Sequence, residues 1–308
     1  MKIHSDFSGF KTVSKPIVTI GTFDGVHLGH RSIIDQLNHV AMTQEGESVI
    51  LTFYPHPRMV LHPGDHGLEL LNTPEEKARL LDEAGVKHLM VYPFSEDFSR
   101  ISAFDYVRNL LVNGIGAFKV IVGYDHRFGR NREGDFQTLS EWGEMLGFEV
   151  EEISAREIDE VNVSSTKIRQ ALKAGDIEVA NKYLGYPYSL TGRVVHGAGR
   201  GSGIGFPTAN LQIHYPYKLI PANGVYAVRV VCNQGQYNGV MNIGVRPTVD
   251  QSGVKSIEIH LFDFSGDLYD AEMTVTLIDR LREEKKFGSI DELKQQISAD
   301  IMKAKERL

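Results

Sequence analysis

The sequence of 308 residues predicts an α/β protein with two domains, a parallel, doubly wound sheet followed by a small antiparallel β-barrel with a terminal helix. Three observations support this prediction. Short apolar runs alternate with helical patterns in the first part of the chain. Short β-rich runs separated by glycine, asparagine and proline turns fill the second part. The length also exceeds the roughly 250–300 residues at which a single hydrophobic core stops growing.

The first part of the chain has the pattern of a parallel sheet with covering helices. Strands are predicted at residues 17–20, 48–53, 88–91, 118–122 and 148–152. Most of these runs are apolar throughout, which is typical of strands buried on both faces. Helical spacing of apolar residues predicts helices around 33–41 and at 73–85, 103–112 and 137–146. The dipeptide Thr73-Pro74 marks the start of the second helix.

The second part begins with helical residues and then changes to short strands. Two helices are predicted at 167–173 and 177–184, and Gly185-Tyr186-Pro187 is the best linker candidate. We therefore expect the domains to span residues 1–186 and 187–308. Strands of the barrel are predicted at 190–195, 224–231, 237–243, 256–264 and 273–278. A helix over 290–301 follows, with Ser289 and Glu292 in the spacing of a capping box.

Composition and charge exclude several classes of protein. With 42% hydrophobic residues, 24% charged residues and one cysteine, Cys232, the chain is neither low-complexity nor held by disulfides. It shows no signal-peptide pattern and no apolar run of about 20 residues, so we expect a soluble, cytoplasmic protein. The net charge of −7 disfavours a nucleic-acid binder. The acidic excess lies before Gly185, and neither part carries a basic stripe.

The first candidate site lies in residues 17–30, which read IVTIGTFDGVHLGH. A buried strand runs through Gly21 into a helix that starts near Gly29. Such a turn places free backbone N–H groups and the positive end of a helix at the carboxyl edge of the sheet, where phosphates bind. The spacing fits neither a dinucleotide fingerprint nor a P-loop. His27 and His30 flank Gly29, so both imidazoles can donate hydrogen bonds to phosphate oxygens.

The His27-Leu28-Gly29-His30 segment resembles the H-x-G-H signature of the nucleotidyltransferase superfamily. Its families carry a second motif late in the domain, and Ser164-Ser165-Thr166-Lys167-Ile168-Arg169 looks like it. The resemblance implies a Rossmann-like domain that transfers a nucleotidyl group with loss of pyrophosphate, while His27 and His30 stabilise the transition state. Arg169 can reach a departing phosphate from a helix start that bears hydroxyls. A capped helix explains either motif alone, but both in this order favour the enzyme.

Other residues at the same sheet edge are candidates for binding the nucleotide and its acceptor. Asp24 either caps the turn before the helix or contacts the adenosine. Residues 52–57 (TFYPHP) form either a proline-ordered loop or a wall around the second substrate. Asp125, after the fourth strand, can receive a ribose or phosphate-site donor. The nucleotide-binding candidates of this domain are Gly21, Phe23, Asp24, Gly29, Asp125, Ser164, Ser165 and Thr166.

The second candidate site lies in residues 197–210, which read GAGRGSGIGFPTAN. Alternating glycines from 197 to 205 predict a flexible flap whose backbone amides can wrap phosphates, although a plain linker has the same composition. Gly203 and Gly205 are its nucleotide-binding candidates. Thr208 and Asn210, two residues apart on an extended segment, are expected to point the same way. A hydroxyl and an amide oxygen suit Mg²⁺, which prefers hard oxygen ligands.

The second part resembles the riboflavin kinase family through this segment, Asn223-Gly224-Val225-Tyr226, residues 242–248 (NIGVRPT) and the strand that carries Glu258. The resemblance implies a six-stranded antiparallel barrel that phosphorylates the ribityl 5′-hydroxyl of riboflavin. It also implies that Thr208 and Asn210 hold Mg²⁺ and ATP and that Glu258 is the catalytic base. The alternation of its strand alone would make Glu258 a solvent-facing residue.

Taken in order, the motifs resemble the family of bacterial bifunctional riboflavin kinase/FAD synthetases from about Gly21 to Leu293. The resemblance implies that the C-terminal domain converts riboflavin and ATP to FMN and ADP. The N-terminal domain would then convert FMN and ATP to FAD and pyrophosphate, and both reactions would require Mg²⁺. His126 departs from the pattern, since an aromatic residue is expected there. The flavin-side candidates are Pro55, His56, Arg282 and Phe287.

Two alternatives stay open at this point. In one, the H-x-G-H adenylyltransferase acts on another phosphate acceptor and the barrel is a non-catalytic binding module. In the other, the barrel binds RNA or a protein, which predicts a basic or aromatic face that the second part does not supply. We expect small-molecule partners (riboflavin, FMN, FAD and ATP), with no nucleic acid and no membrane, and the sequence leaves the oligomeric state open.

Overall fold

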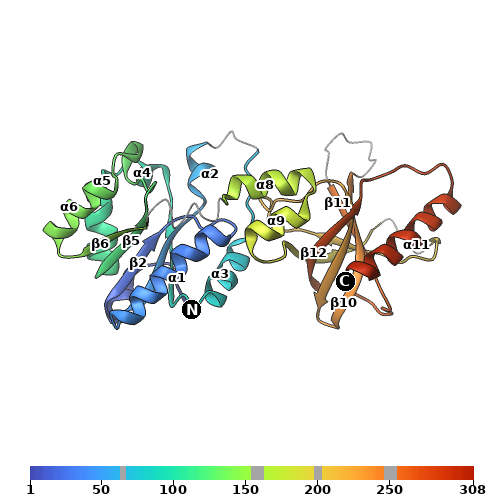
Figure 1. The fold of residues 1–308 in the computed structure, drawn as a ribbon, viewed down its shortest axis with the longest axis horizontal. Coiled ribbons are helices and arrows are strands. Elements are labelled where there is room, and N and C mark those ends of the chain that lie inside the picture. The colour runs from blue at the N-terminus through green and yellow to red at the C-terminus, as the bar shows by residue number, and fades with distance from the viewer. Residues whose placement is uncertain (63–66, 154–162, 198–202, 246–254) are drawn as a thin grey trace. The chain divides into compact units, whose positions relative to one another are not determined.

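The computed structural model describes residues 1–62, 67–153, 163–197, 203–245 and 255–308 (Figure 1). These residues form two compact units, Met1–Ser164 and Ser165–Leu308. The first contains a parallel sheet and the second a closed antiparallel barrel, which confirms the predicted fold class.

The first unit is built on a six-stranded sheet in which every neighbouring pair is parallel. In spatial order the strands are β1 (Lys2–His4), β4 (His88–Pro93), β3 (Glu47–Tyr54), β2 (Pro16–Ile20), β5 (Lys119–Gly123) and β6 (Glu149–Ile153). All five predicted strands are present. The sequence does not predict β1, because its three residues are mostly exposed and make no apolar run.

Helices connect the strands of this sheet. The longer ones are α1 (Leu28–Thr43), α3 (Pro74–Glu83), α6 (Phe136–Leu146) and α5 (Ala103–Tyr106), which continues as a π-helical stretch, Val107–Ile115. The shorter ones are η1 (Phe7–Thr12), α2 (Pro57–Leu61), α4 (Glu96–Ser99) and η3 (Arg130–Arg132). The predicted start of α3 at Thr73-Pro74 is present, and Thr73 forms a capping box with Glu76. The π-helical stretch ends at Gly116, whose φ of 69° suits glycine.

The strand order brings three connections to one edge of the sheet. β2 lies between β3 and β5. The chain therefore adds β3 and β4 on one side of β2 and later adds β5 and β6 on its other side. In open α/β sheets, ligands bind at such a reversal, outside the carboxyl ends of the strands. The turn after β2, the segment after β3 and the loop after β5 are the three connections that the sequence singles out. The fold therefore places them at a shared edge of the sheet, where the sequence predicts a nucleotide site.

The second unit contains a closed barrel of six antiparallel strands, in the order β10-β11-β8-β7-β12-β9. The strands are β7 (Ser189–Val195), β8 (Ala209–Gln212), β9 (Gly224–Cys232), β10 (Gly235–Val245), β11 (Lys255–Leu261) and β12 (Glu272–Arg282). The sequence predicts β8 only as an extended segment, because four residues are too few to show alternation. The terminal helix α11 (Ile290–Arg307) packs Ala304 against Val225, Val240 and Phe262.

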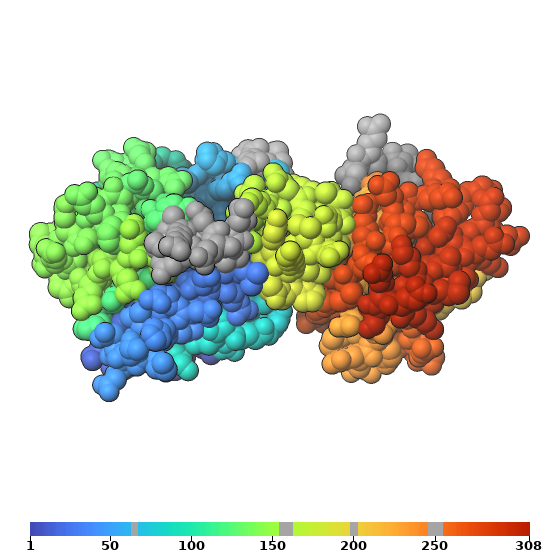
Figure 2. Space-filling view, viewed as in Figure 1, coloured from blue at the N-terminus to red at the C-terminus, as the bar shows by residue number. Residues whose placement is uncertain are grey.

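Two helices, α8 (Ser165–Ala174) and α9 (Ile177–Leu184), belong by their packing to the second unit. The carbonyl oxygen of Leu172 accepts the N–H of Ala222 at 3.0 Å, and the Arg280 guanidinium donates to the carbonyl oxygen of Ala174 at 3.3 Å. Figure 2 shows these yellow-green helices against the orange barrel. The compact division thus precedes α8, whereas the expected boundary at residues 186 and 187 follows α9. That boundary concerns function and stays a prediction.

Candidate active sites

The H-x-G-H motif forms the first turn of α1 at the carboxyl edge of the sheet. His27 is the N-cap residue, and its Nδ1 accepts the backbone N–H of His30 with 3.3 Å between the nitrogens. The two imidazole rings stack with centroids 3.7 Å apart. A Cβ at Gly29 would lie 3.3 Å from the His27 ring, so glycine gives this stack room. The arrangement gathers imidazole edges and helix N–H groups at the predicted phosphate site.

His30 is held as a neutral imidazole. Its Nδ1 is buried and has no hydrogen-bond partner among the described residues, and its ring lies 5.0 Å from that of Phe23. Burial, and then the neighbouring His27 and Lys77, lower the pKa of His30 well below its ordinary value. At neutral pH, His30 can therefore offer a phosphate a hydrogen bond but no positive charge.

The turn between β2 and α1 contains Gly21, Phe23 and Asp24. The N–H of Gly21 continues the sheet by donating to β3 at 3.1 Å, and Phe23 has a φ of 47°. The buried carboxylate of Asp24 accepts the N–H of Leu71 at 2.9 Å and that of Asn72 at 3.3 Å. Asp24 therefore ties the chain before α3 to this turn, a role that neither sequence-based hypothesis named. An adenosine contact by Asp24 stays a prediction.

Lys77 is a member of this site that the sequence does not predict. Its Nζ, at the end of a side chain from α3, donates to the carbonyl oxygen of Thr22 at 2.7 Å. Burial lowers the pKa of Lys77, and the charge of Asp24 acts in the opposite direction. No local pattern separates Lys77 from any other lysine on a helix surface. Its place depends on the contact between Asp24 and the chain before α3.

The segments after β3 and β5 supply the remaining candidates of the first unit. After β3, Pro55 follows a cis peptide bond, and the Nδ1 of His56 accepts the N–H of Arg58 at 3.2 Å, which caps α2. After β5, Asp125 is exposed. The ring of His126 stacks 5.8 Å from that of Phe128. His126 therefore keeps the packing role of the aromatic residue expected at its position.

The second adenylyltransferase motif begins α8. Ser164 is the last residue of the first compact unit, and Ser165, Thr166 and Arg169 lie at the start of α8 in the second. Ile168 is fully buried and fixes one face of this helix. Because the motif and the H-x-G-H helix belong to different compact units, their joint action stays a prediction.

In the barrel, the predicted base and a predicted metal ligand lie side by side. Glu258 on β11 pairs directly with Asn210 on β8 and, on its other side, with Asn242 on β10. Directly paired residues of neighbouring strands project from the same face of a sheet. Ile257 and Ile259 are buried in the core, so Glu258 and its two partners face outward. Asn210 is nevertheless only 9% exposed.

The segment before β8 is fixed by His260. Its Nδ1 lies 2.9 Å from the carbonyl oxygen of Pro207, and because a carbonyl only accepts, this nitrogen carries the proton. The ring of Phe206 packs edge-on at 5.7 Å. These contacts hold Thr208, which is half-buried, at the entry to β8. The sequence does not predict His260, whose only signal is that it shares a strand face with Glu258.

The glycines before β8 fall into two kinds. A Cβ at Gly197 would overlap the side-chain amide of Asn210, so this glycine packs directly on the predicted ligand. Among the residues that the structure describes, a Cβ at Gly203 or Gly205 would meet no atom within 4 Å, although Gly205 has a φ of 90°. The predicted flap residues 198–202 and the motif residues 246–248 lie outside the described part of the chain.

Arg282 and Phe287 lie where β12 leads toward α11. The guanidinium of Arg282 binds the carboxylate of Asp300 on α11 through Nε at 3.0 Å and Nη2 at 2.8 Å, and it stands 5.7 Å from the Phe287 ring. Arg282 also pairs with Val225, which in turn pairs with Asn242. It thus belongs to the same cross-strand row as the predicted base. Contact of these two residues with a flavin stays a prediction.

The donors around Asn210 fit Mg²⁺. The amide oxygen of Asn210 is on β8, and the Thr208 hydroxyl is at the entry to the same strand. These are hard oxygen ligands, and Mg²⁺ usually completes its shell with waters and nucleotide phosphates. Across the described ranges, no group of three or more His, Cys, Asp or Glu side chains could hold a metal alone. A metal bound together with ATP therefore suits this site.

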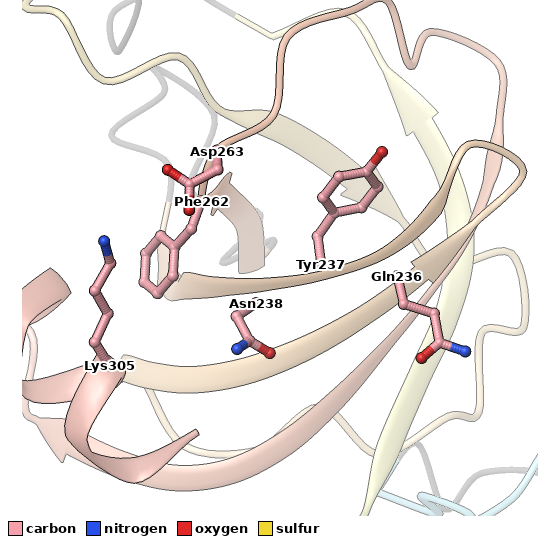
Figure 3. Close-up of a pocket in the computed structure, with 6 residues that line it drawn as sticks. All are labelled: Gln236, Tyr237, Asn238, Phe262, Asp263 and Lys305. Carbon is pink, nitrogen blue, oxygen red and sulfur yellow. The ribbon is translucent and has the colours of Figure 1, made fainter.

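A separate pocket of about 470 Å³ lies on the barrel surface near the end of α11 (Figure 3). It is lined by Gln236, Tyr237, Asn238, Phe262, Asp263 and Lys305. Lys305 reaches over the ring of Phe262, with its Nζ 5.4 Å from the centroid. None of the predicted site residues lines it, so this pocket is distinct from both candidate sites.

Fold and sites together define an enzyme class, a nucleotidyltransferase-type α/β unit joined to an antiparallel barrel of the kinase type. Family models described as FAD synthetase and riboflavin kinase match residues 10–167 and 184–308. The chain belongs to the family of bifunctional riboflavin kinase/FMN adenylyltransferases.

Curated relatives cover nearly the whole chain. The bifunctional riboflavin kinase/FMN adenylyltransferase of Pseudomonas fluorescens is 39% identical over 289 residues, covering 94% of this chain and 92% of the relative. That of Escherichia coli (strain K12) is 38% identical over 292 residues with the same shares.

A solved structure from Streptococcus pneumoniae has the same fold along the whole chain. It is described as a macrolide-efflux protein, is 31% identical, covers 99% of this chain and 98% of its own, and has a TM-score of 0.87. Its description differs from the names of the curated relatives. Within the described ranges of the present chain, no helix has the length and apolar character needed to cross a membrane.

Proposed function

We propose that this protein carries out two consecutive flavin reactions. The barrel transfers the γ-phosphoryl group of ATP to riboflavin and gives FMN and ADP. The α/β unit then joins FMN to the AMP part of a second ATP and gives FAD and pyrophosphate. The observation that carries the proposal is the direct pairing of Glu258 with Asn210 in the part that matches riboflavin kinase. The H-x-G-H helix start supports the second reaction.

In the kinase reaction, Glu258 accepts the proton of the ribityl 5′-hydroxyl as its oxygen bonds to the γ-phosphorus. Thr208 and Asn210 would hold Mg²⁺, and that ion, when bound, offsets the negative charge of the phosphates. Gly203 and Gly205 would leave room for the nucleotide, since a Cβ at either would meet no described neighbour within 4 Å. Arg282 and Phe287, as flavin-side residues, would orient riboflavin.

In the adenylyl transfer, a phosphate oxygen of FMN attacks the α-phosphorus of ATP, so no protein nucleophile is needed. His27, His30 and the first N–H groups of α1 would bind the phosphates, which Gly29 allows to approach closely. Arg169, together with the hydroxyls at residues 164–166, would contact the leaving pyrophosphate. Pro55 and His56 would lie on the side of FMN.

The proposed function is tested by flavin conversion. Purified protein with riboflavin, ATP and Mg²⁺ is expected to form FMN and then FAD, separated by liquid chromatography. No conversion of riboflavin or FMN would contradict the proposal. FMN formation with no FAD would instead assign the α/β unit another phosphate acceptor.

Two substitutions should separate the reactions. Asn210→Ala removes an oxygen ligand, so we expect loss of FMN formation by at least about 100-fold with FAD synthesis from supplied FMN retained. His30→Ala should have the reverse effect, a large loss of FAD synthesis with the kinase rate retained. Loss of both activities in either folded variant would argue against separate sites.

We further propose a cytoplasmic protein whose partners are riboflavin, FMN, FAD and ATP rather than nucleic acid or a membrane. The net charge of −7 and the even distribution of the basic residues support this.

A further inference from the structure

The start of α3 is fastened to the phosphate-binding turn of the first unit. The capping box of Thr73 and Glu76 fixes its first turn, with both reciprocal hydrogen bonds present. Just before it, the N–H groups of Leu71 and Asn72 donate to the carboxylate of Asp24. The first turn of α3 is therefore held against the segment between β2 and α1. Side chains from this turn of the helix can reach the phosphate site.

Lys77 is the side chain that does so. Its ammonium group donates to the carbonyl oxygen of Thr22 at 2.7 Å. Among the residues that the structure describes, this is its only hydrogen bond. An ammonium group has three N–H donors. Lys77 is thus anchored to the turn by one donor and keeps two for a ligand.

The charges around Lys77 point to a role that the neutral His30 does not fill. Burial lowers the pKa of Lys77, and the charge of Asp24, buried in the same turn, opposes this shift and favours the ammonium form. His30 lies within electrostatic range of Lys77, and its buried Nδ1 has no partner in the described ranges. The imidazole of His30 is neutral at pH 7, so the standing positive charge beside it belongs to Lys77.

We propose that Lys77 is a phosphate-binding residue of the adenylyltransferase site and supplies fixed positive charge to the triphosphate of ATP and to the departing pyrophosphate. The proposal rests on the adenylyl transfer proposed above. In that step an oxygen of the FMN phosphate bonds to the α-phosphorus of ATP. The bond from that phosphorus to the bridging oxygen breaks, and its electron pair leaves with pyrophosphate. Lys77 transfers no proton and offsets the charge that grows on the leaving group.

Three variants separate charge from anchoring. Lys77→Met removes the charge and the hydrogen bond to Thr22. Lys77→Gln retains a donor for the Thr22 carbonyl without the charge, and Lys77→Arg retains both. For the Met and Gln variants we expect kcat/KM for ATP to fall at least about 30-fold and the inhibition constant of pyrophosphate to rise at least about 10-fold. The KM for FMN should stay within about 2-fold, and the Arg variant, which keeps the charge, should retain clearly more activity than the Gln variant.

A purely structural role predicts a different pattern. It would leave Lys77→Gln close to wild type, or it would weaken FMN and ATP equally with pyrophosphate inhibition unchanged, and either result overturns the proposal. Arg79→Gln is the matched control, because Arg79 lies on the same helix, is exposed and pairs with Glu83. If Lys77→Met does not fold, the comparison of the Gln and Arg variants decides the question.

The kinase reaction of the same chain is the internal control, because its proposed residues lie in the other unit. It should proceed at the wild-type rate in all three variants. A wild-type protein that forms no FAD would contradict the proposed function itself. A wild-type protein that forms FAD, with Lys77→Gln equally active, would contradict the role of Lys77 alone.

Discussion

Four histidines of this protein differ in the hydrogen bonds that their ring nitrogens make. His27 uses Nδ1 to accept a helix N–H, and His260 uses Nδ1 to donate to a carbonyl oxygen. His30 and His126 each bury one ring nitrogen that has no partner in the described part of the chain. A buried imidazole with an unpartnered nitrogen resists protonation, because its charged form would lack both water and a hydrogen-bond acceptor.

His126→Phe is expected to stabilise the first unit in mild acid. Burial lowers the pKa of His126 to about 4; the charge of Asp125 opposes this shift, and Arg132 adds a smaller lowering. The unfolded chain, with a pKa near 6.5, therefore binds the proton first as the pH falls. The contribution of the neutral ring to the free energy of unfolding is fully present above pH 6.5 and is lost as the pH falls toward 4. At pH 5, the free energy of unfolding is about 2 kcal/mol lower than at neutral pH because of this one group.

Denaturant unfolding at pH 7.5 and pH 5 measures this difference. Trp142, the single tryptophan, packs 6.4 Å from Phe128 and reports on the first unit. Other groups of the unit titrate in the same range, so the quantity to compare is the loss of unfolding free energy in each protein. An equal loss in wild type and His126→Phe would show that the buried ring carries no such penalty.

At the scale of elements, β8 is the shortest strand of the barrel that the structure describes, and its neighbours hold it in place. It pairs with β7 and β11 over only a few residues. Gly197, just after β7, packs on Asn210, and His260 on β11 holds the carbonyl of Pro207. The position of the predicted metal ligand therefore depends on backbone contacts from both sides.

A methyl group at Gly197 is expected to displace Asn210. We expect Gly197→Ala to lower FMN formation at least about 10-fold, because a 1 Å misplacement of a site residue can cost about 100-fold in rate. FAD synthesis from supplied FMN should not change. Gly288→Ala is the matched control, since the nearest described atom to a Cβ there is a Glu292 carboxylate oxygen at 3.5 Å, an ordinary contact. Equal kinase rates in the two variants would contradict a positioning role for Gly197.

The elements that the sequence predicts are those whose signal is local. Apolar runs predict the buried strands of the sheet, and the alternation of Ile257, Glu258 and Ile259 predicts β11. β1 and β8 are too short to show a pattern, and the π-helical stretch after α5 has the same apolar spacing as an α-helix. These features depend on what packs against them rather than on their own residues.

The site follows the same division. The places of H-x-G-H at a helix start and of Asn210 on an extended segment follow from local residues, because glycine and capping residues stand within one short stretch. Lys77 and His260 are not predictable in this way. Each reaches its position through a contact between elements distant in the sequence, Lys77 through Thr22 and His260 through Pro207.

At the scale of the whole molecule, the two proposed reactions are expected to share a requirement for a divalent metal. In both, ATP would bring the metal with its phosphates, so a chelator in excess is expected to stop FMN and FAD formation together. Added Mg²⁺ should restore both rates. Either product forming at an undiminished rate in the chelator would contradict the metal requirement of that reaction.

The packing of α8 and α9 affects whether this chain can be separated into two fragments that are each complete. A fragment that ended at residue 186 would remove α8 from the barrel and leave Arg280 without the carbonyl of Ala174. A fragment that ended at Ser164 would lack most of the motif that the proposed adenylyl transfer needs. One helical hairpin thus belongs to the barrel by its contacts and to the other unit by its proposed chemistry. We therefore expect that no single cut leaves two complete enzymes, which would favour keeping both proposed activities in a single gene.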